Sequence, residues 1–191
     1  MALCTYRVSK SIAVDCEPQN QPKTGLEEKA ILITRKDIDL ATLTQSGATV
    51  TNLNLKSGTT AVSLEWVKQL STSSSEFAAN ETGLDGFTHR FAGRVHYSDA
   101  HSSEFLNELR MAEVVMVVET KYKGTNNASA FKIYGLEQGL RMTAMNHSTA
   151  ENGGGATFEI ASQEGYSESF PWLVWNEGSY AVNKTKFDGL F

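Results

Sequence analysis

The sequence predicts a mainly β domain, either a β-sandwich or a partly rolled barrel, with one short flanking helix at about residues 99–112. Two observations support this prediction. The segment 87–97 (FTHRFAGRVHY) alternates between two faces with the period of a strand, and the run at 113–121 (EVVMVVETK) has the β-branched composition of a strand buried on both faces. Because 40% of the 191 residues are apolar, the chain can bury one substantial core, and we expect a single domain over residues 1–191.

The expected strand at 87–97 carries a mostly aromatic set of residues on one face: Phe87, His89, Phe91, Gly93, Val95 and Tyr97. A turn at Ser98 and Asp99 follows. Apolar residues then recur at intervals of three and four, as in a helix: Phe105, Leu106, Leu109 and Ala112. One of Asp99, Ser102 and Ser103 is expected to accept hydrogen bonds from the first helical turn.

The remaining strands are expected on both sides of this stretch. Residues 130–146 are interpreted as two strands joined by a tight turn at 137–139, where glycine supplies a positive φ. Short alternating or apolar runs predict the other strands, at 5–14, 28–35, 49–56, 61–70, 157–160 and 170–175. Residues 36–47 fit either a short helical turn or an irregular edge strand.

Two segments look suited to reach outside the domain. Residues 71–86 (STSSSEFAANETGLDG) form the most polar tract and are expected to be a flexible loop. Residues 184–191 keep apolar side chains to the chain end, which indicates that this C-terminal arm is held down. The sequence leaves open whether the arm docks on its own core, which we favour, or on another subunit.

Composition argues against several classes of function. The net charge is −5 and basic residues are scattered, so nothing indicates nucleic-acid binding or attraction to an anionic membrane. No signal peptide or membrane-spanning run is evident, so synthesis in a cytoplasm is expected. In that setting Cys4 and Cys16 are predicted to be free thiols.

No motif indicates catalysis, a metal or a cofactor, and we expect that the protein is not an enzyme. His89 and His96 point to opposite faces of the predicted strand and therefore do not share a metal. Arg90 and Arg94 lie on its polar face, where cross-strand acids such as Glu113 or Glu119 are expected to pair with them. The tryptophans Trp66, Trp172 and Trp175 could stack on sugars, but two of them, Trp172 and Trp175, lie in a strongly apolar run and are interpreted as core residues.

Between Phe87 and about Trp175 the sequence resembles bacteriophage tail-tube and neck-ring structural proteins, especially small ones from phages of Bacteroides-type hosts. The resemblance lies in three segments: EVVMVVETKYKG at 113–124, AFKIYGLEQGLRMTAMNHS at 130–148 and EGYSESFPWLV at 164–174. These segments position a fold and carry no catalytic signature. The first 80 residues do not contribute to the resemblance.

The resemblance implies a virion structural protein of the tail or neck that forms a homo-oligomeric ring, of six or twelve copies, as a conduit for the genome. Neighbouring tail or portal proteins are the implied partners, and DNA passes without specific binding or a membrane. The tract 71–86 and the arm 184–191 are the implied contacts, with these candidate subunit-interface residues: Phe77, Leu84, Phe187, Leu190 and Phe191. At −5 per copy, an acidic lumen is expected to let DNA slide.

Two alternatives come from different classes. A capsid decoration protein would have a similar β-rich composition but would not form such rings. A β-sandwich module that binds a glycan or a protein would use Trp172 or Trp175 as its contact surface.

Overall fold

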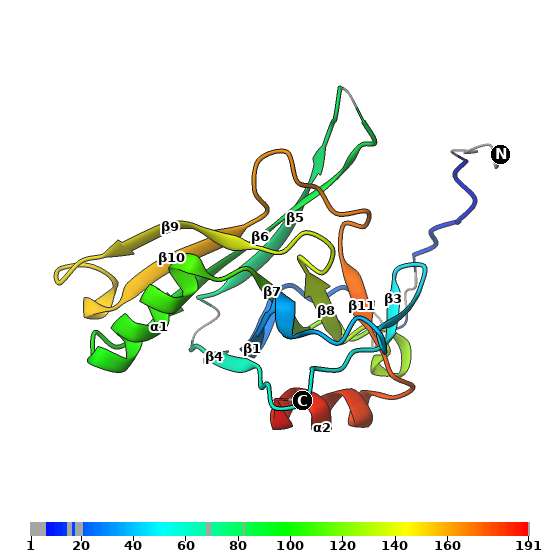
Figure 1. The fold of residues 1–191 in the computed structure, drawn as a ribbon. Coiled ribbons are helices and arrows are strands. Elements are labelled where there is room, and N and C mark those ends of the chain that lie inside the picture. The colour runs from blue at the N-terminus through cyan, green and yellow to red at the C-terminus, as the bar shows by residue number, and fades with distance from the viewer. Residues whose placement is uncertain (1–6, 15–16, 18–20, 68–69, 82, 191) are drawn as a thin grey trace.

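Two β-sheets and two α-helices make up the structure, a computed structural model that describes residues 7–14, 17, 21–67, 70–81 and 83–190 (Figure 1). The seven-stranded sheet has the order β2-β3-β11-β8-β7-β1-β4, and the four-stranded sheet has the order β5-β6-β10-β9. The predicted mainly β fold is confirmed as a sandwich-like arrangement of two sheets that does not close into a barrel.

The strands have the following bounds: β1 Leu26–Thr34, β2 Thr44–Ser46, β3 Thr49–Asn52, β4 Val62–Glu65, β5 Thr72–Ala78, β6 Gly86–Val95, β7 Val114–Thr120, β8 Phe131–Tyr134, β9 Arg141–His147, β10 Ala156–Ala161 and β11 Leu173–Trp175. The helices are α1 Ala100–Met111 and α2 Tyr180–Gly189, with short 3-10 turns at Arg35–Asp37, Thr125–Asn127 and Asn152–Gly154.

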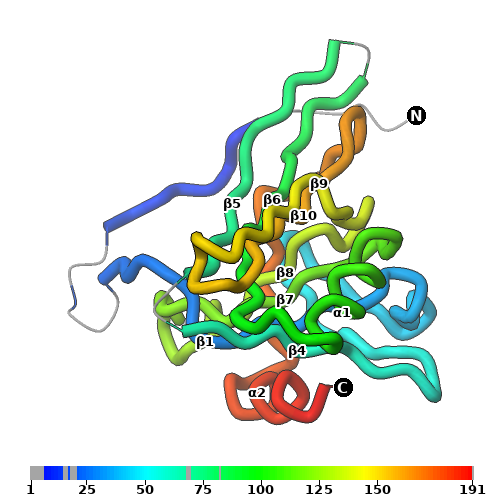
Figure 2. Tube along the Cα trace, turned by 90° about the vertical axis from the view of Figure 1, so that its left-hand side faces the viewer, coloured from blue at the N-terminus to red at the C-terminus, as the bar shows by residue number. Residues whose placement is uncertain are grey.

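The seven-stranded sheet has a separate apolar core on each face, which explains why its central strand β7 is buried throughout. One core lies between the two sheets and α1, and includes Met116, Phe91 and Phe158. The other lies under α2 and includes Val117, Phe131 and Phe187. Because successive β7 side chains point to opposite faces, the continuous apolar run supplies both cores. Figure 2 shows α2 on the side of this sheet away from β6, β9 and β10.

The predicted central strand and helix are confirmed. In β6 the core-facing set contains Phe91 and Val95, both buried, and Gly93 lies between the Phe91 and Phe158 rings. Asp99 caps α1, where its carboxylate accepts a hydrogen bond from the Ser102 N–H at 2.8 Å. Ser102 and Ser103 were the other expected caps, and they lie inside the helix.

The interpretation of residues 130–146 as a paired hairpin is wrong, because β8 and β9 belong to different sheets. The turn between them has positive φ at Gly135 and Gly139, as expected. Leu140 then forms a bridge with Val114, and the chain leaves the seven-stranded sheet to pair with β10. This turn therefore transfers the chain from one layer to the other.

The first half differs from expectation at two places. Residues 7–14 are extended and exposed and form no strand pairing, while the rest of the expected strand, residues 5 and 6, lies outside the described residues. The tract 71–86 is not a loop, because β5 pairs with β6 along its whole length, from Thr72 with Ala92 to Ala78 with Gly86. Its serine and threonine side chains alternate across an edge strand and satisfy the period of two without an apolar face.

Candidate assembly surface

The β5–β6 hairpin extends beyond the rest of the fold (Figures 1 and 2). Two of the sequence-predicted interface residues lie on it. Phe77 is 65% exposed on β5, and Leu84 is 71% exposed in the connection to β6. The Phe77 ring meets the Phe87 ring edge-on, with centroids 6.2 Å apart. The hairpin therefore presents Phe77 to solvent on a regular two-stranded support and Leu84 in the connection at its end.

β5 and β9 are the edge strands of the four-stranded sheet. Among the described residues each has a sheet partner on one side only, and each is seven residues long. Natural edge strands are usually protected from pairing with another chain by proline, lysine or a covering element. Neither TSSSEFA in β5 nor RMTAMNH in β9 contains proline or lysine, although helix α1 packs near β9. The composition of the two strands therefore does not protect their edges.

The outer face of this sheet is polar and carries a balanced set of charges. Arg90 on β6 pairs with Glu159 on β10, and Thr143 on β9 donates to the same carboxylate at 3.2 Å. The expected partners of the arginines, Glu113 and Glu119, lie elsewhere. Glu113 pairs with Arg35 and Arg141, and Glu119 points into a separate cluster near α2. The expectation failed because it took β7 as the neighbour of β6, whereas β10 and β5 occupy that place.

His89 joins the four-stranded sheet to the rest of the fold. It is buried, its Nδ1 accepts from the Gly135 N–H at 3.0 Å, and its Nε2 lies 2.9 Å from the Phe170 carbonyl oxygen. Since Nδ1 accepts, Nε2 carries the proton and donates, so the imidazole is neutral. Burial lowers the pKa of His89, although the carbonyls of Phe170 and Pro171 act in the opposite direction.

A pair of glutamates makes a second link at the same place. The Glu168 carboxylate accepts from the N–H groups of Glu137 and Gln138, both at 2.9 Å. In return, the Glu137 carboxylate accepts from the Ser169 N–H and hydroxyl, also at 2.9 Å. Burial raises the pKa of Glu168, and the two N–H donors only partly offset this. The β8–β9 turn and the segment before β11 are therefore held together, which orients the four-stranded sheet.

The C-terminal arm expected at 184–191 is part of helix α2, which docks on its own chain. Phe187 is fully buried, with its ring 5.1 Å from that of Phe131. Leu190 packs at the rim of the same core, and its carbonyl accepts from the Ala61 N–H at 3.4 Å. These two residues are consequently unavailable to a second subunit in this structure. Phe191, like Cys4 and Cys16, lies outside the described residues.

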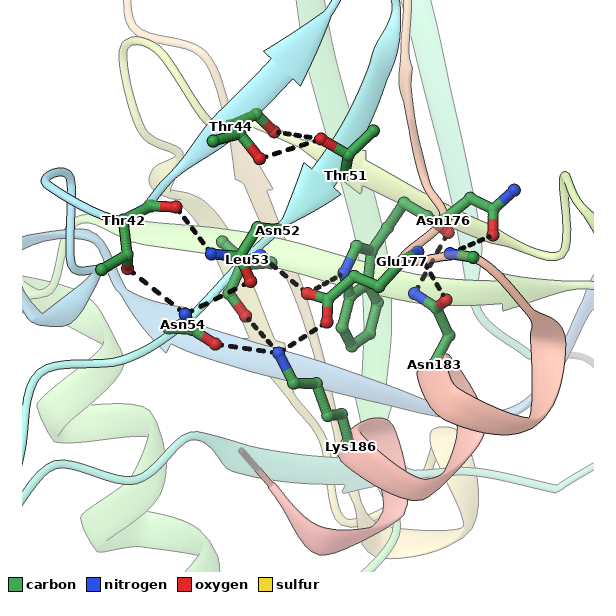
Figure 3. A network of polar contacts seen from close by, with 12 residues as sticks. Thr42, Thr44, Thr51, Asn52, Leu53, Asn54, Asn176, Glu177, Asn183 and Lys186 are labelled. Atoms are coloured by element: carbon green, nitrogen blue, oxygen red, sulfur yellow. Dashed lines mark hydrogen bonds and ion pairs between the residues drawn. The ribbon is translucent and has the colours of Figure 1, made fainter.

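Figure 3 shows the polar network that fixes this helix. The Glu177 carboxylate accepts from the Leu53 N–H at 2.7 Å and from the Trp175 indole N–H at 3.0 Å. Its second oxygen lies 2.7 Å from the Lys186 ammonium. Asn183 adds two contacts, accepting from the Glu177 N–H and donating to the Trp175 carbonyl. A carboxylate just before the helix thus connects β3, β11 and α2.

A second cluster holds the first turns of α2. Glu119 is buried on β7, and its carboxylate receives hydrogen bonds from Lys123 at 2.7 Å, Tyr180 at 2.7 Å and Lys184 at 3.1 Å. Burial favours the neutral acid, but these donors outweigh it, so the pKa of Glu119 is lowered. The sequence contained a signal for this helix that we did not use: Ser179 caps it, and Tyr180, Asn183 and Phe187 follow at helical spacing.

Side chains that could bind a metal or stack on a sugar lie in structural positions elsewhere in the fold. Across the described residues, no group of three or more His, Cys, Asp or Glu side chains is arranged to hold a metal ion. Trp175 is buried, as expected, and Trp66 is buried as well. The expectation that Trp172 packs in the core is wrong, because its side chain is 43% exposed, with the Lys132 ammonium 4.7 Å from its ring centre. That contact occupies one face of the ring. No helix of the described chain combines the length and apolar composition needed to cross a bilayer.

No protein-family model, curated protein or solved structure matches the chain.

Proposed function

We propose that the protein is a virion structural subunit of a phage tail tube or neck, whose copies join their four-stranded sheets into a ring around a lumen. The observation that carries the proposal is the pair of edge strands without proline or lysine, β5 and β9, at opposite sides of one sheet. The two edges differ, so β5 of one copy meets β9 of the next in a head-to-tail contact. Such contacts close into rings when the rotation between copies allows it.

Strand direction supports this contact. β5, β6, β10 and β9 are successively antiparallel, so β5 and β9 run in opposite directions. Rotation about a ring axis leaves each strand direction along that axis unchanged. The β9 strand of one copy therefore meets β5 of its neighbour in the antiparallel sense, which is the more stable pairing per residue. The joined sheet keeps the alternation of its strands across every subunit boundary.

The ring that results is open. Six copies contribute about 24 strands, and barrels with as few as 16 strands already leave an aqueous channel. Buried and more exposed side chains alternate along the two central strands, β6 and β10, so one face of the barrel stays on the protein core and the other faces water. A water-filled lumen of this kind suits a conduit for the genome without enzymatic turnover.

The charge of the sheet requires a correction to the expected acidic lumen. The four strands carry Arg90, Arg94 and Arg141 against Glu76 and Glu159, so the acidic excess of the chain lies outside them. Tight DNA binding depends on free cations that neutralise phosphates. Here Arg90 and Arg141 have carboxylate partners, which leaves Arg94 as the one arginine of the four strands without an ion pair among the described residues. Low affinity then comes from neutralised charge rather than from repulsion.

The test combines light scattering and negative-stain imaging of the purified chain with charge changes on both edges. Lysines at Thr72 and Ser74 on β5, together with Ala144→Lys on β9, place like charges across the proposed contact and should abolish rings. Glutamates at Thr72 and Ser74, combined with Ala144→Lys, should restore them. Gln45→Lys on the exposed strand β2 is the control and should leave rings unchanged.

The proposal is wrong if the parent chain forms rings that the lysine variants leave intact. It also fails if the parent forms only monomers or trimers at every concentration and after mixing with tail extracts. Trimers would favour the decoration role instead.

A further inference from the structure

A groove with an apolar floor runs between the outer strand β4 and helix α1. Its volume is about 340 Å³, and its floor is formed by Leu64, Val95, Phe105 and the half-exposed Val62. β4 is the last strand of the seven-stranded sheet and pairs only with β1 among the described residues. The groove therefore has an open backbone edge on one side and a helix on the other, which is the arrangement that accepts an added strand.

The rim of the groove is acidic. Glu65 on β4 and Glu104 and Glu108 on α1 line it, all three are exposed, and none forms an ion pair within the described chain. Glu104 and Glu108 stand four residues apart on one helix face, where like charges repel and destabilise the helix slightly. Besides them, His101 is the titratable side chain that faces the groove. A ligand with a cation would relieve this repulsion.

The exposed segment 7–14 (RVSKSIAV) has the complementary character. In an extended chain Val8, Lys10, Ile12 and Val14 share one face, and the three apolar residues are 93%, 93% and 88% exposed. Its two charged residues, Arg7 and Lys10, are both basic. The opposite face carries serines and alanine besides Arg7. To form a stable strand, this segment needs only a sheet edge to pair with and an apolar surface that covers its three exposed apolar side chains.

We infer that residues 7–14 of one copy bind in the β4–α1 groove of another copy, as an added strand on β4. The inference rests on the proposed assembly, which supplies neighbouring copies. In Figures 1 and 2 the segment stands apart from the groove of its own chain, which favours a second copy as the acceptor. The apolar face covers Val62 and Phe105, and the Lys10 ammonium reaches Glu104 and Glu108 while its stem lies on the floor.

The dimensions are compatible. Eight extended residues span about 26 Å, whereas the twelve residues of α1 span about 18 Å. The segment thus covers the full length of the groove, with residues to spare at its ends.

The full-length chain with a photoreactive benzoylphenylalanine in place of Ile12 tests this contact. Equal amounts of isotope-labelled and unlabelled chains are mixed and irradiated, and the cross-linked peptides are mapped by mass spectrometry. We expect cross-links between labelled and unlabelled chains at residues 62–65 and 101–108. Lys10→Glu should lower their yield at least fivefold, and adding Glu104→Lys with Glu108→Lys should restore it. Lys23→Glu, the same charge change outside the segment, is the control.

The outcomes separate this contact from ring formation. Rings seen by imaging, but with cross-links within one chain, at other residues or absent, would overturn the inference and leave the ring intact. Cross-links at the groove between different chains, in material that never forms rings, would support the inference and contradict the proposed ring. If Lys10→Glu left the yield of cross-links unchanged, the acidic rim would have no role in binding the segment.

Discussion

The imidazole of His89 accepts a hydrogen bond from the backbone N–H of Gly135 at 3.0 Å and thereby joins the middle of one sheet to the end of a strand in the other. The second ring nitrogen meets the Phe170 carbonyl at 2.9 Å. One buried side chain thus satisfies two backbone groups from separate segments. This contact fixes the position of the four-stranded sheet. The direction in which the β5–β6 hairpin extends therefore depends on it as well.

Replacing His89 should destabilise the fold and remove a specific pH dependence. His89→Phe leaves the Gly135 N–H and the Phe170 carbonyl without partners, at a cost of about 1–3 kcal/mol each. In the parent, the lowered pKa means that the unfolded state binds a proton more readily, so stability is complete above the usual value of 6.5 and falls as the pH decreases below it. Urea denaturation at several pH values measures both effects.

The comparison that decides this prediction is the slope of unfolding free energy between pH 6.5 and 5. It should be smaller in His89→Phe than in the parent. His147→Phe, at an exposed position, is the control and should leave the slope unchanged. Equal slopes in all three chains would show that the pKa of His89 is not lowered by folding.

Glu119 should contribute stability that acid removes. Glu119→Gln removes the buried carboxylate that Lys123 and Lys184 share and leaves each ammonium group with one more exposed partner, Glu27 or Asp188, and breaking such a buried pair costs about 3 kcal/mol. Because the pKa of Glu119 is lowered, its contribution is present above the usual value of 4.5 and is lost as the pH falls below it. The difference between variant and parent should therefore narrow toward pH 3 in denaturation experiments.

A matched control lies in the same cluster. Glu27 also pairs with Lys123, but at 3.4 Å and with a more exposed side chain. Glu27→Gln should change the unfolding free energy by less than about 1 kcal/mol, as is usual for exposed pairs. If Glu27→Gln were as costly as Glu119→Gln, net charge rather than the buried contact would account for both.

Local patterns in the sequence predicted the elements but not their partners. The alternation at 87–97 and the helical spacing after Asp99 correspond to β6 and α1, because side-chain period and capping are local properties. Whether β8 and β9 lie in the same sheet depends on the direction in which the chain leaves the Gly135–Gly139 turn. No local residue pattern predicts this direction. For the same reason Arg90 was matched with Glu113 or Glu119 instead of Glu159.

Only part of the candidate surface could be predicted from the sequence. The resemblance to tail-tube proteins implies that the polar tract 71–86 is a subunit contact, and its apolar residues Phe77 and Leu84 are both exposed. The sequence predicts a loop where the serine-rich strand β5 lies. The strand is missed because its stability comes from pairing with β6 rather than from its own composition. Phe187 and Leu190 were assigned to the same contact because apolar character at a chain end does not distinguish docking on the chain's own core from docking on a neighbour.

Gly93 should tolerate no side chain. A Cβ there would lie 2.7 Å from a ring carbon of Phe91 and 2.8 Å from one of Phe158, so both rings would have to move. We expect Gly93→Ala to cost about 1–3 kcal/mol by overpacking. Gly189→Ala, at the end of α2 with open space around it, should instead be neutral or stabilise by up to about 1 kcal/mol. Thermal unfolding of the two variants checks the opposite signs, and a neutral Gly93→Ala would show that the rings can yield.

Phe77 and Phe187 should separate assembly from folding. Phe77→Asp removes an exposed side chain and one ring contact, worth about 1 kcal/mol, so the monomer should stay folded while ring formation weakens. Phe187→Asp places a charge in the core beneath α2 and should unfold the chain or cost more than about 4 kcal/mol. Circular dichroism reports folding and light scattering reports assembly. Rings that persist at parental concentration with Phe77→Asp would remove the hairpin from the subunit contact, because the substitution puts a carboxylate at its most exposed aromatic position.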